Sequence, residues 1–197
     1  MKGTRNVGLI VIGAIVLILF LWGCGGYNSL VKEDENVKKT WNNVQTEYQK
    51  RYDLVDNLVN TVKGAAKFEQ ETLTQVVQAR AKASSIQLNA DQLTPENMQK
   101  FEQAQSELSG SLNRLLVTVE RYPELKATQN FLKLQEQIPS IENDVRNARR
   151  LFNESVNTYN TKVRSFPTNL FAGVFGFKAR EGFKAEAGAE KAPKVQF

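Results

Sequence analysis

The chain of 197 residues contains no histidine and a single cysteine, Cys24. This composition excludes histidine-based catalytic triads, zinc sites with histidine ligands and CxxC redox chemistry, so we expect no enzyme of these classes, no cofactor and no metal site. The formal net charge of +5 comes mostly from the two ends, because residues 27–166 hold 19 basic against 18 acidic side chains. Balanced charge is not typical of nucleic-acid-binding proteins, which present one basic face, and we expect no nucleic-acid partner.

An uncharged apolar run, VGLIVIGAIVLILFLWG, occupies residues 7–23. As a helix it would be roughly 26 Å long, at the lower limit for crossing a bilayer. Lys2 and Arg5 precede the run and mixed charges follow it, which predicts a cytoplasmic segment at residues 1–6 and a body outside the cytoplasm. We therefore expect a bacterial single-pass membrane protein with a transmembrane helix.

The same run also fits a cleaved lipoprotein leader. Residues 21–24, LWGC, resemble a bacterial lipobox in which Cys24 would be lipidated after cleavage, although Trp22 does not suit its position. We interpret the run as a retained helix, and both alternatives attach the body to a membrane. The acidic residues 33–35 that follow are interpreted as a hydrated collar beyond the membrane.

Residues 27–164 are predicted to form an all-α bundle, because apolar residues recur at helical spacing and not in the alternation typical of strands. The expected helices cover residues 29–64, 68–88, 95–122 and 124–164. The first carries a long apolar stripe, formed by Val37, Trp41, Val44, Tyr48, Tyr52, Val55, Val59 and Val62. A stripe of this length needs partner helices to cover it.

Turn signals separate the expected helices at Gly64, at Thr94 and Pro95, and at Tyr122 and Pro123. Thr94 is a predicted N-cap with proline in the first turn after it. These turns predict an elongated antiparallel up-and-down four-helix bundle, with an extended coiled coil as the alternative. Pro139 within the last helix predicts a kink.

Polar side chains crowd the first predicted helix around YQKRYDLVDN, residues 48–57. Arg51, Asp53 and Asn57 are therefore candidates for an interaction surface. The alternative is a solvated face with local ion pairs, each contributing under about 1 kcal/mol. The arginines at 146, 149 and 150 are likewise interpreted as a charged surface that neighbouring acidic residues neutralise.

Residues 165–183 form an irregular tail rich in Phe and Gly, with neither helical nor strand periodicity. Its aromatic residues Phe171, Phe175 and Phe177 have two possible roles, packing against the bundle or contacting the membrane beside the anchor. Residues 184–197 are poor in apolar side chains and are predicted to be disordered.

Several segments resemble sequence blocks of the LemA family of bacterial membrane-anchored proteins. They are YNSLV at 27–31, WNNVQTEYQKRYDLVDNLVNTVKG at 41–64, QARAKASS at 78–85, YPELK at 122–126, YN at 159–160, SFPTN at 165–169 and GFK at 176–178. The resemblance implies an anchored four-helix body on a membrane, and the family's magnetosome member suggests a role in organising membranes. The chain departs from the family pattern at Lys50, at Asp56 and near Phe68, where Arg, Pro and His are usual.

Together these features predict a non-enzymatic, membrane-anchored cell-envelope protein that scaffolds or binds a membrane or periplasmic protein. Arg51, Asp53 and Asn57 are the candidate surface for that partner. A lipid-binding, membrane-organising structural protein that uses Phe171 and its neighbours is one alternative. An accessory subunit of an envelope enzyme is the second.

Overall fold

The computed structural model describes the backbone of residues 2–64 and 68–184. Side chains are described from residue 23 onward in these ranges, and also at residues 13, 14 and 17. The described chain is helical without strands, which confirms the all-α prediction. The predicted disordered segment lies outside the described residues, apart from Lys184.

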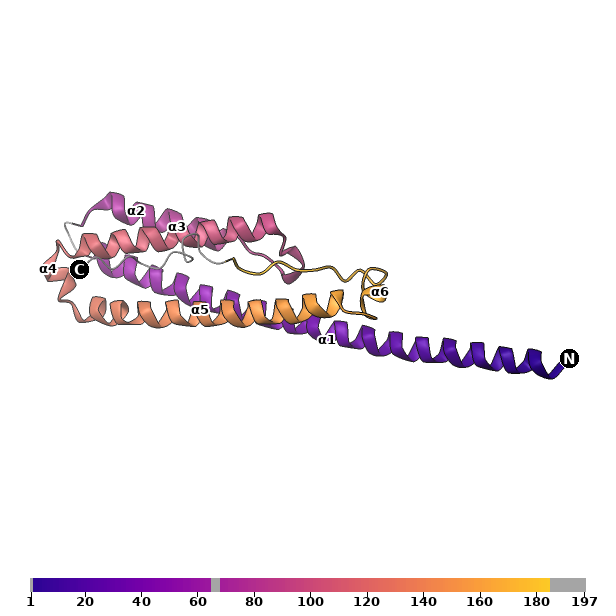
Figure 1. Cartoon of the computed structure of the whole chain (residues 1–197). Coiled ribbons are helices and arrows are strands. Elements are labelled where there is room, and N and C mark those ends of the chain that lie inside the picture. Colours follow the sequence, from indigo (N-terminus) through magenta and orange to yellow (C-terminus); the bar gives the residue numbers. More distant parts are fainter. Residues whose placement is uncertain (1, 65–67, 185–197) are drawn as a thin grey trace, which may run out of the picture.

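Helix α1, Lys2–Lys63, is a single helix of 62 residues that joins the apolar run to the first stripe of the bundle. It has no proline to interrupt it, and its N-terminal part projects beyond the other helices (Figure 1). Among the side chains described here, no helix is both long enough and apolar enough to cross a membrane. The backbone of the predicted membrane segment, residues 7–23, belongs to α1, but most of its side chains lie outside that description.

The other elements follow at α2 (Gln70–Ser85), a 3-10 turn (Ala90–Gln92), α3 (Pro95–Val119), α4 (Pro123–Lys126), α5 (Gln129–Arg164) and α6 (Asn169–Ala172). The predicted cap of α3 is confirmed, since the Thr94 hydroxyl accepts a hydrogen bond from the Asn97 backbone N–H. The fourth expected helix is divided into α4 and α5. The reason is a second cap, because the Thr128 side chain accepts from the Phe131 N–H and starts α5 anew.

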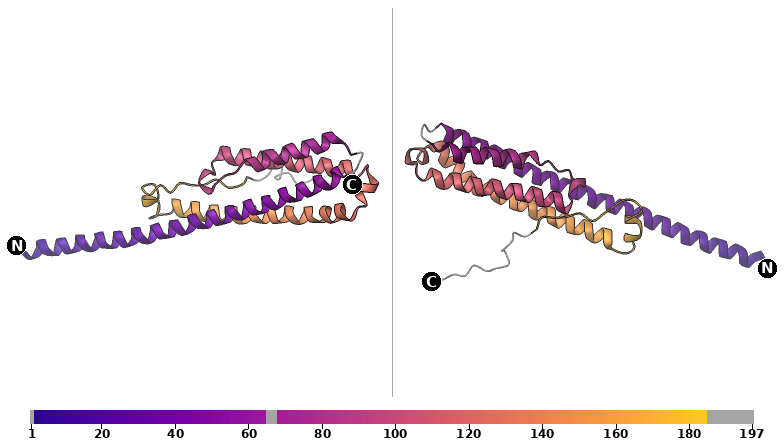
Figure 2. Two further views of the ribbon diagram at one scale, coloured as in Figure 1. Left: turned by 180° about the vertical axis from the view of Figure 1, so that it is seen from behind. Right: turned by 90° about the horizontal axis from the view of Figure 1, so that it is seen from above.

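The four long helices lie along one axis, with α1 and α3 running in one direction and α2 and α5 in the other (Figure 1). Helix α1 packs chiefly on α5, and α2 packs chiefly on α3. Helix α5 continues through Pro139, and the predicted kink there stays a prediction. The tail contains the short helix α6 beside α1 and then turns back along the bundle (Figure 2).

The core follows the predicted stripe of α1, whose eight apolar residues are all buried. Trp41 is 1% exposed and donates its indole N–H to the Leu88 carbonyl oxygen at 2.6 Å. Its ring lies 5.6 Å from that of Phe101 and 5.2 Å from that of Phe152, centroid to centroid. Burying each such side chain contributes roughly 1.5–3 kcal/mol, so these rings fasten α1, α3 and α5 together.

Candidate functional site

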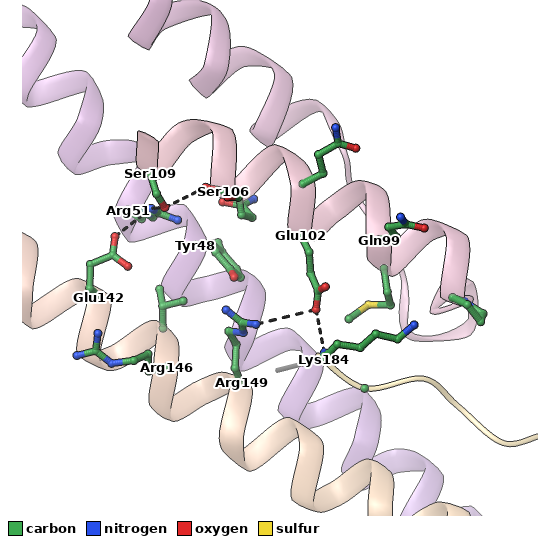
Figure 3. Close-up of a pocket in the computed structure, with 16 residues that line it drawn as sticks. Tyr48, Arg51, Gln99, Glu102, Ser106, Ser109, Glu142, Arg146, Arg149 and Lys184 are labelled. Atoms are coloured by element: carbon green, nitrogen blue, oxygen red, sulfur yellow. Dashed lines mark hydrogen bonds and ion pairs between the residues drawn. The ribbon is translucent and has the colours of Figure 1, made fainter. Parts of the chain in front are cut away.

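A polar groove of about 980 Å³ lies between α3 and α5, with α1 beneath it. We call it the α3–α5 groove, and Figure 3 shows the side chains that line it. Helix α3 packs mainly on α2, and α5 packs mainly on α1. Little direct packing therefore holds α3 and α5 against each other. The α3 side carries polar residues, among them Gln99, Ser106 and Ser109, instead of large apolar side chains that would close the gap.

Arg51 lies at the base of this groove and is only 3% exposed. One terminal nitrogen, Nη2, donates to the Ser109 hydroxyl of α3 and lies 3.0 Å from Oε1 of Glu142 on α5 (Figure 3). The Arg51 Nε and the Gln105 Oε1 are buried without a hydrogen-bond partner among the described residues. Incompletely paired buried groups lower stability. The Arg80 Nε, outside the groove, is buried in the same way.

The structure does not bring the three predicted surface residues together. Asp53 and Asn57 are exposed on the other side of α1 from Arg51, as expected for positions about 200° and 240° further around the helix. Asp53 accepts a hydrogen bond from the Gln49 side-chain amide at 2.8 Å, and the Asn57 carbonyl accepts from the Thr61 hydroxyl at 2.8 Å. Of the three, Arg51 lines the α3–α5 groove, and its ion-pair partner is Glu142, not Asp53.

Positive side chains outnumber negative ones in the groove, with Arg51, Arg146, Arg149 and Lys184 against Glu102 and Glu142. Arg149 is 4.0 Å from the Glu102 carboxylate, and its guanidinium lies 4.5 Å from the centre of the Phe183 ring. Arg146 donates to the Asn143 side-chain oxygen at 2.7 Å within its own helix. The prediction of arginines neutralised by acidic neighbours fits Arg150 best, since it pairs with Glu154 at 2.6 Å. It fits the groove arginines Arg146 and Arg149 less well.

The groove contains no recognisable acid–base chemistry. Burial raises the pKa of Tyr48 to about 12, and burial also raises the pKa of Tyr52, so both phenols are neutral near pH 7. The Tyr52 hydroxyl accepts from the Gln105 amide and donates to the Ala83 carbonyl at 3.2 Å. No three metal-ligating side chains converge anywhere in the described part of the chain. The arrangement is suited to binding through hydrogen bonds and charge.

The end of the tail, residues 177–184, is held against the bundle, and we call it the strap. Its Arg180 Nη2 donates to Asp34 at 2.7 Å and to Asp91 at 2.8 Å, while Nη1 donates to the Ala90 carbonyl at 2.7 Å. The expected hydrated collar is therefore wrong for Asp34, which is buried because the strap covers it. Sequence reasoning missed this ion pair, since its two residues are 146 positions apart.

Two asparagines of α5 hold the strap backbone as a neighbouring strand would. Asn160 donates to the Arg180 carbonyl and accepts from its N–H, both at 2.8 Å. Asn153 does the same for Phe183, at 3.0 Å and 2.8 Å. A Cβ at Gly182 would lie 2.8 Å from the Asn153 side-chain oxygen, so any other residue there would displace the side chain that holds Phe183. The seven-residue spacing of the two asparagines on one helix face was the available sequence signal.

The three predicted tail phenylalanines lie together at the end of the bundle where α1 projects. Phe171 is in van der Waals reach of a Cβ built at Gly23, and the rings of Phe175 and Phe177 lie 5.1 Å and 5.8 Å from that of Tyr27. Phe175 is half exposed, whereas Phe177 packs partly on the core. Cys24 is exposed on α1 in the same region. The tail therefore packs against the bundle and also leaves apolar surface uncovered.

The chain is similar in sequence to a known protein family and to several of its members. The LemA family profile matches residues 40–197. The chain is 27% identical over 148 residues to the protein LemA of Metamycoplasma hominis, covering 75% of this chain and 64% of that protein. It is 23% identical over 175 residues to the magnetosome protein MamQ 2 of Paramagnetospirillum magneticum and 24% identical over 174 residues to MamQ of Magnetospirillum gryphiswaldense, covering 80% of this chain and 64% of each relative.

The chain thus spans about two thirds of the length of these relatives. The profile match includes every residue of the α3–α5 groove and of the strap, as well as the tail phenylalanines. It begins at Thr40, so it covers the bundle and not the apolar run. Because the match takes in well over half of the sequence, the chain belongs to the LemA family.

Proposed function

We propose that this chain is a non-enzymatic, membrane-anchored cell-envelope protein that holds a helical bundle at the membrane surface as a scaffold for another protein. The observation that carries the proposal is the continuity of α1, which runs from Lys2 to Lys63. An apolar run and a bundle that share one helix are coupled without a flexible linker. The bundle would then keep a fixed distance and orientation relative to the bilayer, with residues 1–6 in the cytoplasm.

The end of the bundle nearest the apolar run supports this placement. Phe166, Leu170, Val174 and Phe175 are each more than half exposed, and Tyr27 is 40% exposed. We call these five residues the apolar end. Exposed aromatic and aliphatic side chains favour the interface between water and lipid. Phe171, the neighbour of Leu170 in α6, lies against Gly23, and Phe175 packs on Tyr27 four residues further along α1. The surface of a bilayer would lie at this level if α1 crossed it.

The relatives' names are consistent with a role at membranes, because MamQ is described as a protein of the magnetosome. A retained helix is also the simpler form of the anchor, since Cys24 lies within α1 and not at a break before it. The contact of Phe171, Phe175 and Phe177 with lipid is part of the proposal. So is a partner protein in the membrane or outside the cytoplasm.

The anchor is tested by alkaline extraction of membranes from cells that express the full-length chain. We expect the wild type to stay with the lipid and Leu17→Arg to be released, since an arginine at the centre of a spanning helix costs about 2.5–3.5 kcal/mol. Val117→Arg is the matched control, because it also places arginine at an exposed apolar position but at the distant end of α3.

Intact mass distinguishes the two kinds of anchor. An unprocessed chain supports the retained helix. Acylation at Cys24, together with release of the Cys24→Ser variant from the membrane, would identify a lipoprotein. Extraction of the wild-type protein into the alkaline supernatant would contradict membrane anchoring of either kind.

A membrane-organising role is the second candidate, and the apolar end is the observation that favours it. If this surface shapes lipid directly, the chain should cluster or deform vesicles without any protein partner. Replacement of Leu170 and Val174 by serine should then abolish vesicle deformation while leaving the chain anchored. Unchanged vesicles with the wild-type chain would exclude this second role.

A further inference from the structure

The α3–α5 groove has the dimensions of a short extended peptide. Along α3 its lining runs from Pro95 to Ser109, which is about 21 Å at 1.5 Å per residue. An extended chain of about six residues has this length. The volume of about 980 Å³ is far larger than a single small anion needs.

The chemistry of the two walls differs. The α3 wall offers Gln99, Gln103 and Ser106, whose side chains both donate and accept hydrogen bonds. Such groups match the alternating N–H and C=O groups of a peptide backbone. A sulfate ion, which presents acceptors alone, would use only the donors among them.

The opposite wall and the strap supply the cations. Arg146 is exposed and bonds within its own helix. Lys184 is exposed at the end of the strap, with its ammonium nitrogen 3.8 Å from the Glu181 carboxylate. Arg149 is one quarter exposed beside them. Because residues 27–166 are almost neutral as a whole, a local excess of positive charge in a hollow is a feature of this site and not of the general surface. Charge complementarity selects acidic side chains in the ligand.

The position of the groove argues against a lipid headgroup as its occupant. Arg51 is 28 residues beyond Gly23 on the same helix, a separation of about 42 Å along α1. If the apolar run crosses a bilayer, the groove stands well clear of its surface. A segment of another protein can reach this height, and a lipid headgroup cannot.

From these observations we infer that the α3–α5 groove binds an extended acidic segment of a partner protein. The segment lies along α3, with its backbone on Gln99, Gln103 and Ser106. Its Asp or Glu side chains face Arg146, Arg149 and Lys184. This inference rests on the proposed function and deepens it by naming the surface of the scaffold and the chemistry of its partner.

The test is selection of peptides on the purified full-length chain in detergent, from a displayed library of random sequences about seven residues long. We expect the selected peptides to be enriched in Asp and Glu. The most enriched peptide, labelled with fluorescein, then gives a dissociation constant by fluorescence anisotropy. Detergent removes the membrane from the experiment, so failure here is distinct from failure of the anchoring test.

Matched variants locate the binding. Arg146→Glu should weaken the labelled peptide at least about tenfold, a typical size for reversing a charge at an interface. Arg150→Glu makes the same change of charge on the same helix outside the groove, and it should alter the affinity less than about twofold. Ser106→Trp fills the groove without changing its charge and should also weaken binding. Circular dichroism establishes that each variant is folded.

Three results would overturn the inference. The first is that no peptide is enriched, or that the enriched peptides are rich in Lys and Arg. The second is that Arg146→Glu and Arg150→Glu weaken binding equally. The third is that free glutamate or inorganic phosphate displaces the labelled peptide at concentrations as low as those of unlabelled peptide. The last result would assign the groove to a small anion.

Discussion

Arg180 holds the strap, which has no regular secondary structure, against the bundle. Its guanidinium donates three hydrogen bonds, to two carboxylates and a carbonyl. The side chains of Arg180 and Asp34 are both 12% exposed, so water screens their interaction only weakly. Without Arg180, the nearly buried Asp34 keeps only the ion pair with Lys38 at 3.0 Å, and the loss of its shorter, better buried contact is costly. The stability of the strap therefore depends strongly on this one residue.

Replacing Arg180 by alanine should lower the free energy of unfolding of the full-length chain by about 2 kcal/mol, the contribution of a hydrogen bond to a charged group. Lys178→Ala on the same strap is the control, since Lys178 is exposed and should contribute under about 0.5 kcal/mol. Chemical unfolding in detergent, followed by circular dichroism, measures both. Equal stability of the two variants would mean that the ion pair contributes nothing.

Tyr48 makes the stability of the bundle dependent on alkaline pH. Burial raises its pKa from 10.0 to about 12, because the charged phenolate is poorly solvated in the core. The stabilisation from the neutral phenol is therefore complete below pH 10 and is lost as the pH rises through about 12.

Between pH 9 and pH 12, the free energy of unfolding should fall by up to about 2–3 kcal/mol less in Tyr48→Phe than in the wild type. Denaturant unfolding curves at the two pH values measure this difference. Tyr27→Phe is the control, because Tyr27 is 40% exposed. Other groups titrate in the same range, so the quantity to compare is the difference between the variants. A Tyr48→Phe curve parallel to the wild type would show that the phenol of Tyr48 ionises as readily in the folded chain as in the unfolded chain.

At the level of elements, the strap is attached to α5 as an extended chain paired with a helix. Asn153 and Asn160 each satisfy one N–H and one C=O of the strap, which replaces the ladder that a neighbouring strand would offer. Each such hydrogen bond contributes about 0.5–1.5 kcal/mol. Their joint loss should release the strap without unfolding the bundle.

The double variant Asn153→Ala with Asn160→Ala should speed hydrogen exchange at the Arg180 and Phe183 amides by at least about tenfold. Amides in the middle of α1 should remain protected. Asn157→Ala, an exposed position between the two asparagines, is the matched control. Unchanged exchange in the double variant would mean that the Phe183 ring and Arg180 hold the strap alone.

At the scale of the whole molecule, α1 gives the protein a direction, with the apolar end where Phe175 packs on Tyr27 and the connection through α4 at the opposite end (Figure 1). Val174 is 80% exposed at the apolar end, and Val117 is 71% exposed near the opposite one. If the chain stands on a bilayer as proposed, these two similar side chains have different surroundings.

Cysteines at these two positions, introduced singly into a Cys24→Ser chain and labelled with an environment-sensitive fluorophore, test this orientation. In vesicles, the label at Val174→Cys should shift to shorter wavelength because it enters the lipid interface, and the label at Val117→Cys should not. Equal emission from the two labels would contradict the upright orientation.

The groove and the strap could not be read from the sequence, because they depend on contacts between distant residues. The helical stripe of α1 was visible locally, as was the polar crowding that made Arg51 a candidate. Which face Arg51 occupies was decided by Ser109 and Glu142, which come from two other helices. Grouping Arg51 with Asp53 and Asn57 followed their proximity in the chain and ignored the turn of the helix between them.

The sequence by itself determined the all-α class, the cap at Thr94, the buried stripe and the membership of the LemA family. These follow from periodicity, capping and sequence blocks, which act over a few residues or are read directly. Only the tertiary structure decided that Asp34 is buried under Arg180, that Phe183 completes the aromatic core and that a groove stays open between α3 and α5. The physical reason is that burial and ion pairing are properties of surfaces brought together by folding, and no short stretch of sequence contains both surfaces.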